Sequence, residues 1–318
     1  MQSAHIVQPT EVAGISYYYP PAESVLDARD GKVNIPLEGF PIPLLKEDFS
    51  EETPSYDAVG RGIYHLLRVN PEAALADRYA ALLRDGYPHL LAELATYLVM
   101  LDKKDVDLPY LDRKISYLKI FTLLEPDNPR LPFEIGATFF DKGMHLAAMR
   151  NTTLHLFAAE KYLRKSFNLA ADDTQVICLL ADVCYILGRY DDAGKLWKVI
   201  GSDLTTESAE KIRRRLNLIA GGNTPSVPAV DYLQAVGVAL EAYETEDYEE
   251  AAAIILDVME AVSVYDEFPL AEINYLLGLC YVKLDIPRYA EQYLKEAVRI
   301  RPDYEEAELE MQKLGVAP

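Results

Sequence analysis

Histidines and carboxylates are the side chains of this sequence that could perform acid–base or metal chemistry. The histidines are His5, His65, His89, His145 and His155. His145 and His155 share one helical segment but stand ten residues apart, which corresponds to about 15 Å along a helix. One metal ion cannot bridge that gap. We therefore predict no metal site.

Sequence motifs of catalysis and cofactor binding are missing from the chain. It contains no HExxH, CxxC, P-loop or GxSxG pattern, and the glycines of VGRGIYH lack the strand and the further glycine of a dinucleotide fingerprint. The abundant carboxylates lie in helical patterns, where they are usually solvated rather than paired as an acid and a base. We predict a protein that is not an enzyme, with no catalytic residues and no cofactor.

The cysteines and the apolar runs indicate the cellular compartment in which the protein is expected. Cys178, Cys184 and Cys280 are an odd number of cysteines in apolar helical pattern, which is typical of buried free thiols in a reducing compartment. The apolar runs are too short to span a bilayer. The first residues lack the cationic start and apolar stretch of a secretory signal. These features predict a cytoplasmic protein without membrane insertion.

The stretch YLLGLCYVKLDIPRYAEQYLKEAVRIRPD, residues 275–303, predicts two helices joined by a tight turn. Apolar residues recur at helical spacing on both sides of a break at Asp285 to Pro287. Gly278 and Ala290 lie twelve residues apart, one on each helix, and small side chains there allow two antiparallel helices to approach closely. Pro302 ends the second helix, since proline lacks the N–H that a helix requires.

The same spacing of small residues recurs upstream. Ala159 and Ala193 are 34 residues apart, Ala193 and Ala251 are 58 apart, and Ala251 and Ala290 are 39 apart. A 34-residue period with insertions of 24 and 5 residues explains these intervals. The larger insertion matches an extra helix and the loop GGNTPSVP. A further insertion of eleven residues separates Gly136 from Ala159.

This pattern resembles the tetratricopeptide repeat (TPR) family, whose repeats carry small residues, aromatic residues and a terminal proline at these positions. The resemblance covers roughly residues 108–303, with Asn274 as a departure where the family usually has an aromatic residue. It implies an all-α fold, a right-handed superhelical TPR-like solenoid of antiparallel helix pairs.

We divide the chain into four parts: residues 1–54, a proline-rich and mostly non-helical arm; 55–107, an N-terminal helical cap; 108–220, TPR-like repeats with the extra helix at about 205–220; and 229–318, TPR-like repeats with a C-terminal capping helix. The arm, with SYYYPP and VNIPLEGFPIPLL, is too apolar to lie free in water. We expect it to fill the groove of its own solenoid. Docking in a neighbouring subunit and a loosely ordered arm are the alternatives.

In this family the first helix of each pair lines a concave surface that holds ligands. The resemblance implies a peptide-binding groove lined by Phe133, Phe140, Asp182, Tyr185, Tyr243 and Tyr275. Aromatic side chains dominate recognition surfaces, and tyrosine adds a polar group. Ordinary packing between helices is the alternative role for side chains on this surface, and we expect it for the aliphatic ones, such as Leu240 and Leu279. The Lys, Arg and Asn residues with which some family members clamp a C-terminal carboxylate are replaced here, so we expect no such clamp.

Charge indicates the kind of partner. The net charge of −20 argues against a nucleic-acid partner, and the basic cluster KIRRR, Lys211 to Arg215, is expected to be a solvated helix face. No Lys or Arg occurs from Leu216 to Val282. We expect an acidic patch to steer a cationic ligand, formed by Glu241, Glu244, Glu246, Asp247, Glu249 and Glu250. Simple solubility is the alternative role of these charges.

These features together predict a cytoplasmic, non-enzymatic scaffold or adaptor. Its ligand would be an extended or helical peptide of a protein, with basic character, held in the concave groove. The first alternative is a self-assembling homo-oligomer whose N-terminal arm docks in a neighbouring subunit. The second is an enzyme whose site is assembled from scattered carboxylates.

Overall fold

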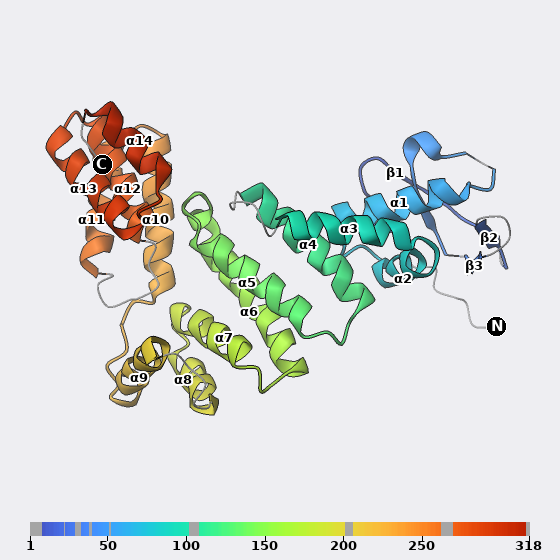
Figure 1. The fold of residues 1–318 in the computed structure, drawn as a ribbon, viewed down its shortest axis with the longest axis horizontal. Helices are drawn as coiled ribbons and strands as arrows, with labels where there is room; N and C mark the ends of the chain where they lie inside the picture. The colour runs from blue at the N-terminus through green and yellow to red at the C-terminus, as the bar shows by residue number, and fades with distance from the viewer. Residues whose placement is uncertain are drawn as a thin grey trace. The chain divides into compact units, whose positions relative to one another are not determined.

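A computed structural model describes residues 8–21, 23–28, 33–37, 40–50, 52–101, 108–200, 206–261 and 270–315. The backbone forms two compact units, Met1–Ile135 and Gly136–Pro318. Apart from four short strands and two 3-10 helices, the regular structure of the described residues is α-helical (Figure 1). The prediction of an all-α chain of TPR-like helix pairs is confirmed.

The described part of the first unit joins short strands to helices. Its elements are β1 (Ile15–Tyr18), β2 (Val25–Ala28), β3 (Val33–Pro36), β4 (Ile42–Leu45), η1 (Lys46–Asp48), α1 (Tyr56–Val69), α2 (Ala76–Gly86), α3 (Pro88–Leu101) and α4 (Leu108–Leu124). β1 pairs with β4 and β2 with β3, both antiparallel. Because each sheet has two strands, its stability depends on packing against the helices.

Part of the arm is buried against α1 and α2 rather than in a solenoid groove. Leu37, Ile42 and Leu44 are at most 1% exposed and share one apolar core with these helices. The Tyr79 hydroxyl of α2 donates to the Pro41 carbonyl oxygen at 2.6 Å. The prediction that the arm fills its own groove is therefore wrong for these three residues, because the first unit already covers them. Tyr19, Val25 and Phe49 of the arm stay exposed, and docking in a neighbouring subunit stays a prediction.

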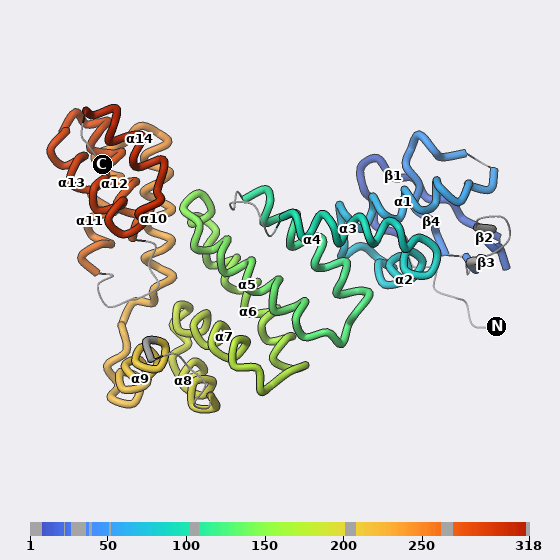
Figure 2. The backbone as a smooth tube through the Cα atoms, viewed as in Figure 1, coloured from blue at the N-terminus to red at the C-terminus, as the bar shows by residue number. Residues whose placement is uncertain are grey.

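Helix α5 (Arg130–Met144) starts in the first unit and ends in the second, which continues as consecutive helix pairs. The remaining elements are η2 (Leu146–Asn151), α6 (Thr152–Leu169), α7 (Thr174–Ile186), α8 (Tyr190–Val199), α9 (Thr206–Ala220), α10 (Ala229–Glu244), α11 (Tyr248–Ala261), α12 (Leu270–Lys283), α13 (Pro287–Ile300) and α14 (Glu305–Lys313). α7 packs on α8, α10 on α11, and α12 on α13. α14 packs on α13 and buries Tyr304, Ala307 and Met311, so that α10 to α14 form one bundle (Figure 2).

Small residues lie where paired helices touch, at the predicted intervals. The four alanines that define the period are all 0% exposed: Ala159, Ala193, Ala251 and Ala290. A Cβ atom added to Gly278 of α12 would lie 2.8 Å from Leu294 Cγ of α13. A Cβ atom on Gly136 would likewise lie 2.7 Å from Leu163 Cγ. The predicted close approach of the helices is confirmed, since no ordinary side chain fits at these two glycines.

The pairs α7–α8, α10–α11 and α12–α13 share one turn geometry. In the turn that joins the two helices of each pair, one residue has a positive φ: Gly188 (77°), Glu246 (67°) and Asp285 (56°). In each turn the next N–H donates to the carbonyl oxygen five residues back, at 2.8 Å, 2.8 Å and 3.0 Å respectively, which is a Schellman-type helix end. The three residues are 58 and 39 positions apart. Turns and buried alanines therefore follow the same intervals.

The insertion between α5 and α6 folds as η2 and packs on α10. A Cβ atom on Gly237 would lie 2.5 Å from the backbone nitrogen of Arg150, so the two backbones are in direct contact. The Arg150 guanidinium pairs with Glu241, one turn further along α10, at 2.8 Å. The residues inserted between α5 and α6 thus form a packing contact with α10, a helix of a later repeat.

Replacing Gly278 with alanine, and more strongly with leucine, should lower the free energy of unfolding by about 1–3 kcal/mol, because the added atoms overlap Leu294. The matched control is Gly194→Ala, where the new Cβ would meet Ile219 at an ordinary 3.5 Å. Since alanine favours helix over glycine by about 1 kcal/mol, the control should be neutral or stabilising. Chemical denaturation compares the variants. Equal midpoints for all of them would show that the repeat register is wrong.

Replacing Gly62 with alanine should detach β4 from α1, because the new Cβ would overlap the Pro43 carbonyl oxygen. A loss of about 1.4 kcal/mol in local stability would speed amide exchange of residues 42–45 about tenfold. Hydrogen exchange with mass spectrometry measures this rate. The same Gly194→Ala control should leave it unchanged. Unaltered protection in Gly62→Ala would contradict the seating of the arm on α1.

Candidate protein-binding surface

Asp182 and Tyr185 on α7, two of the predicted groove residues, are covered by the extra helix α9. Tyr185 is 1% exposed. Asp182 pairs with Arg215 at 3.0 Å and with Lys211 at 3.4 Å, both from α9. Tyr185 is therefore closed to a peptide while α9 stays in place, and the partly exposed Asp182 carboxylate is already paired. The chain itself occupies this stretch of the inner helix face.

Arg215 is the side chain that seats α9 on α7. It is 2% exposed, and its guanidinium carbon lies 4.4 Å from the ring centre of Tyr185 and 5.5 Å from that of Trp197. The prediction that the whole basic cluster is a solvated face is wrong at this residue, because the helical turn directs Arg215 onto the rings. Arg213 and Arg214 are exposed. The sequence pattern alone did not distinguish the three arginines.

Phe133 and Phe140 both lie on α5 and are partly exposed. Phe133 belongs to the first unit, and the Arg130 guanidinium carbon lies 4.7 Å from its ring centre. Phe140 belongs to the second unit. Their role in a groove stays a prediction.

The other two predicted groove residues, Tyr243 of α10 and Tyr275 of α12, remain partly exposed. The Tyr275 ring centre lies 5.0 Å from that of Tyr304, which precedes α14. The Tyr243 ring centre lies 5.4 Å from that of Tyr248, at the start of α11. We call the surface formed by Tyr243, Tyr275 and the α14 carboxylates Glu306 and Glu310 the C-terminal face.

Carboxylates of α14 lie close enough to both tyrosines to act on their ionisation. Burial, with smaller contributions from Glu310 and Glu306, raises the pKa of Tyr275 to about 12. The pKa of Tyr243 is also raised, first by burial and then by neighbours that include Cys280, Tyr248 and Glu310. Both phenols therefore stay neutral at physiological pH, and the negative charge of the face comes from the glutamates. Glu310 also accepts from Lys313 at 2.5 Å.

Sequence reasoning missed Glu306 and Glu310 as part of this surface. The segment DYEEAELEMQK shows that they share one helical face, since they are four residues apart. It does not show that α14 packs beside Tyr275, which is a consequence of the buried Tyr304, Ala307 and Met311.

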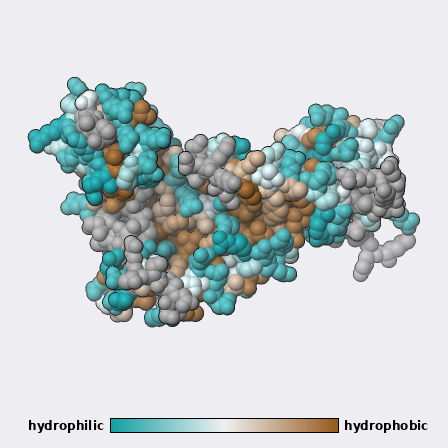
Figure 3. Space-filling model, in the orientation of Figure 1, coloured by the Kyte–Doolittle hydropathy of each residue, from teal (hydrophilic) through white to brown (hydrophobic). Residues whose placement is uncertain are grey.

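The predicted acidic patch lies at the end of α10, the following turn and the first turn of α11. All six carboxylate side chains are exposed: Glu241, Glu244, Glu246, Asp247, Glu249 and Glu250. Two have local partners, since Glu241 pairs with Arg150 at 2.8 Å and Asp247 Oδ1 accepts from the Glu250 N–H at 3.3 Å. In Figure 3 the visible face of α10 to α14 is mostly hydrophilic. Steering of a ligand by this patch stays a prediction.

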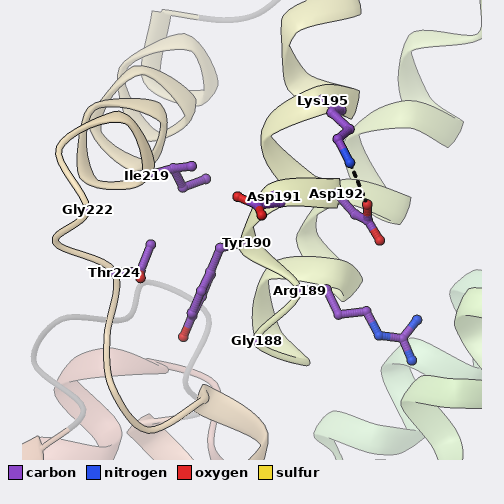
Figure 4. A pocket seen from close by; sticks show the side chains of 9 residues that line it. All are labelled: Gly188, Arg189, Tyr190, Asp191, Asp192, Lys195, Ile219, Gly222 and Thr224. Carbon is purple, nitrogen blue, oxygen red and sulfur yellow. Dashed lines mark hydrogen bonds and ion pairs between the residues drawn. The ribbon is translucent and has the colours of Figure 1, made fainter.

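An open cleft with a volume of about 600 Å³ lies between the start of α8 and the α9–α10 loop. Figure 4 shows Tyr190 and Asp191 facing Ile219 and Thr224 across it. Asp192 and Lys195, which pair at 3.3 Å, point away from the loop. Its lining mixes charged, polar and apolar side chains, a composition that suits accommodation of a ligand.

The cysteines and histidines of the described residues do not assemble a reactive site. Burial raises the pKa of Cys184 to about 11 and that of Cys280 to about 12, so both thiols are protonated and weakly nucleophilic at neutral pH. Within the described ranges, no group of three His, Cys, Asp or Glu side chains is placed to hold a metal ion. His5 lies outside the described residues. In the same ranges no helix has the length and hydropathy needed to cross a membrane.

Replacing Arg215 with alanine should release α9, because it removes both the Asp182 ion pair and the contact with two aromatic rings. We expect a loss of about 2–4 kcal/mol, as for other buried ion pairs that lose one partner. Trp197 is the single tryptophan of the chain, so its fluorescence reports the release directly. Arg213→Ala, an exposed change on the same helix, is the control. If both variants match the parent in stability and fluorescence, Arg215 does not hold α9.

Comparison with known proteins finds similar solved structures, whereas no family model and no curated protein matches the chain. The TPR domain of P58(IPK) is 22% identical, with 70% of this chain and 55% of that chain covered and a TM-score of 0.32. This chain thus spans about half the length of that protein. MamA is 15% identical, with 71% and 97% covered and a TM-score of 0.27. A tetratricopeptide repeat protein from Parabacteroides merdae is 14% identical, with 81% and 91% covered and a TM-score of 0.28. The chain's own buried small residues and repeated turns make its second unit a TPR-like array of helix pairs.

Proposed function

We propose that this protein is a non-enzymatic interaction scaffold that binds a basic segment of a partner protein on its C-terminal face. The observation that carries the proposal is the combination, on α10, α12 and α14, of partly exposed tyrosines with neighbouring carboxylates. Carboxylates pair with Lys and Arg, and tyrosine rings attract the same cations through their electron-rich faces.

The distribution of charge supports a cationic partner for this part of the chain. Residues 229–318 contain 20 Asp and Glu against six Lys and Arg, which is −14 of the total −20. The other 228 residues contain 31 acids against 25 bases, a net charge of −6. A field of one sign raises the local concentration of an oppositely charged ligand and speeds its association. The acidic patch at the α10–α11 turn adds to this field beside the C-terminal face.

The backbone at Glu246 gives further support. Glu246 has a φ of 67°, in the left-handed region, where the equivalent turn of the α7–α8 pair has Gly188. A side chain with a Cβ atom costs about 1–2 kcal/mol in this conformation. The position therefore carries a carboxylate despite a backbone cost that glycine would avoid, which is consistent with use of the charge.

The proposal narrows the predicted groove. Asp182 and Tyr185 contact α9, so we place the binding surface on the later helix pairs, and the role of Phe133 and Phe140 stays a prediction. For the self-assembling alternative, Leu26, Leu37, Phe40, Ile42 and Leu44 of the arm are already buried in the first unit, and no observation favours it. No observation on the described residues favours the enzyme either. The cytoplasmic location stays a prediction.

Neutralising part of the acidic patch should weaken binding of a basic peptide. For the triple variant Glu244→Gln, Glu246→Gln and Glu249→Gln we expect the Kd of a labelled Lys- and Arg-rich peptide to rise about tenfold, because each exposed ion pair contributes about 0.2–1 kcal/mol. Fluorescence anisotropy at low and at physiological salt measures the change. The parent protein should itself bind more weakly at the higher salt.

The control removes the same number of charges from the first unit: Glu11→Gln, Glu47→Gln and Glu52→Gln, all exposed in the parent. It should leave the affinity within about twofold of the parent, since these charges lie on another unit. Salt-independent binding, or equal weakening by both triple variants, would contradict the proposed role of the acidic patch.

A further inference from the structure

The inner face of the α7–α8 pair already holds a bound helix, the chain's own α9. Its Arg215 guanidinium lies over the Tyr185 ring at 4.4 Å and pairs with the Asp182 carboxylate at 3.0 Å. The Tyr185 ring is supported from the side by Tyr190, with ring centres 5.0 Å apart and planes at 66°. The α7–α8 pair therefore shows one way in which this protein binds an arginine: the guanidinium stacks on a tyrosine ring and pairs with a carboxylate.

The next helix pair repeats the tyrosine part of this arrangement. Tyr243 and Tyr248 stand 58 residues after Tyr185 and Tyr190, the interval that also separates Ala193 from Ala251. Their ring centres are 5.4 Å apart and their planes meet at 61°, close to the geometry of the earlier pair. Tyr243 thus has the same sideways support as Tyr185 and the same position on the first helix of its pair.

Within the described ranges, the two pairs differ in that an arginine of the same chain lies over the tyrosine ring only in the first; at the second, Arg150 pairs with Glu241 instead. Tyr185 is 1% exposed beneath α9, whereas Tyr243 is partly exposed and, among the described residues, has no Lys or Arg over its ring. Leu240 replaces Asp182 at the equivalent position. Further negative charge is on α14, which packs beside Tyr275; its Glu306 and Glu310 both act on Tyr275, and Glu310 also acts on Tyr243.

We propose that the C-terminal face binds an arginine presented by a helix of a partner protein, as α7 binds Arg215 of α9. The inference rests on the proposed function and names the side chain that is recognised. The partner's guanidinium would lie over the Tyr243 ring and pair with Glu310, while Tyr275 and Glu306 border the same site.

Arginine fits this surface better than lysine. Its guanidinium is planar, stacks on aromatic rings, is less strongly hydrated than an ammonium group and pairs with a carboxylate through two parallel N–H donors. The ammonium group of lysine cannot stack flat on a ring, so its binding free energy would come mainly from the surrounding negative charge. A preference for arginine over lysine therefore separates recognition at Tyr243 from general attraction to an acidic surface.

The experiment uses two end-capped, alanine-based helical peptides that differ only in arginine or lysine at every fourth position, each with one fluorescent label. Anisotropy titrations with the full-length protein at physiological salt give the two Kd values. We expect the arginine peptide to bind about three- to tenfold more tightly. Tyr243→Phe should preserve this preference, because the ring face remains. Tyr243→Leu should abolish it and weaken arginine binding about tenfold, with lysine binding little changed.

Glu310→Gln tests the carboxylate separately and should weaken arginine binding about threefold or more. Tyr289→Ala is the matched control, since Tyr289 is 48% exposed on α13 and packs on Tyr281 rather than on the C-terminal face. It should leave both Kd values unchanged. Thermal midpoints of all variants show whether Tyr243→Leu is folded, and Glu310→Gln supplies the result if it is not.

The outcomes separate this inference from the proposed function. If arginine and lysine peptides bind with equal, salt-sensitive affinity and Tyr243→Leu changes neither, arginine recognition is overturned while the acidic scaffold stands. If neither peptide binds the parent protein at low salt, both proposals fail. Equal losses in Tyr289→Ala and Tyr243→Leu would also overturn the inference, because the effect would not belong to this face.

Discussion

Close contact between the two helices of each pair is the constraint on which the second unit depends. At Gly136 and Gly278 the facing helix approaches so closely that an added Cβ would lie within 2.8 Å of a leucine side chain. Fully buried alanines hold the same place on the second helices. Interaxial distance in helix packing follows the size of the contacting side chains. The period of small residues therefore sets how the pairs form, and the insertions between them are free to vary.

The insertions distinguish this array from a regular series of helix pairs. The residues between α5 and α6 form η2, whose backbone meets α10 at Gly237. The residues after α8 form α9, which buries Arg215 against Tyr185 and Trp197. Each insertion therefore covers part of a helix in another pair: η2 covers part of α10, and α9 covers Tyr185 of α7. In the later pairs the charge is −14 over residues 229–318, and the exposed groups are tyrosines and carboxylates.

The helix pairs, their turns and the buried cysteines could be predicted because they depend on local sequence. Helix pairs, the turn near Asp285 and the free, apolar cysteines follow from spacing within a few turns of helix. The acidic patch is likewise exposed because charged side chains of a helix end and turn have no apolar partner. The arm was harder. Its apolar residues were recognised, but their partner on α1 and α2 depends on Gly62, which admits the Pro43 backbone and leaves no periodic signal.

The sequence by itself determined the helix-pair architecture, the period, the acidic character and the tyrosines Tyr243 and Tyr275. Only the tertiary structure decided which inner residues are open, because exposure depends on what packs over a residue from a distant part of the chain. Tyr185 looks equivalent to Tyr243 in sequence, yet α9 covers Tyr185 and Tyr243 stays partly exposed. Glu306 and Glu310 join Tyr275 because α14 buries Tyr304, Ala307 and Met311 beside α12. Spacing along the chain fixes which side chains share a helix face, but burial of apolar surface decides which faces meet.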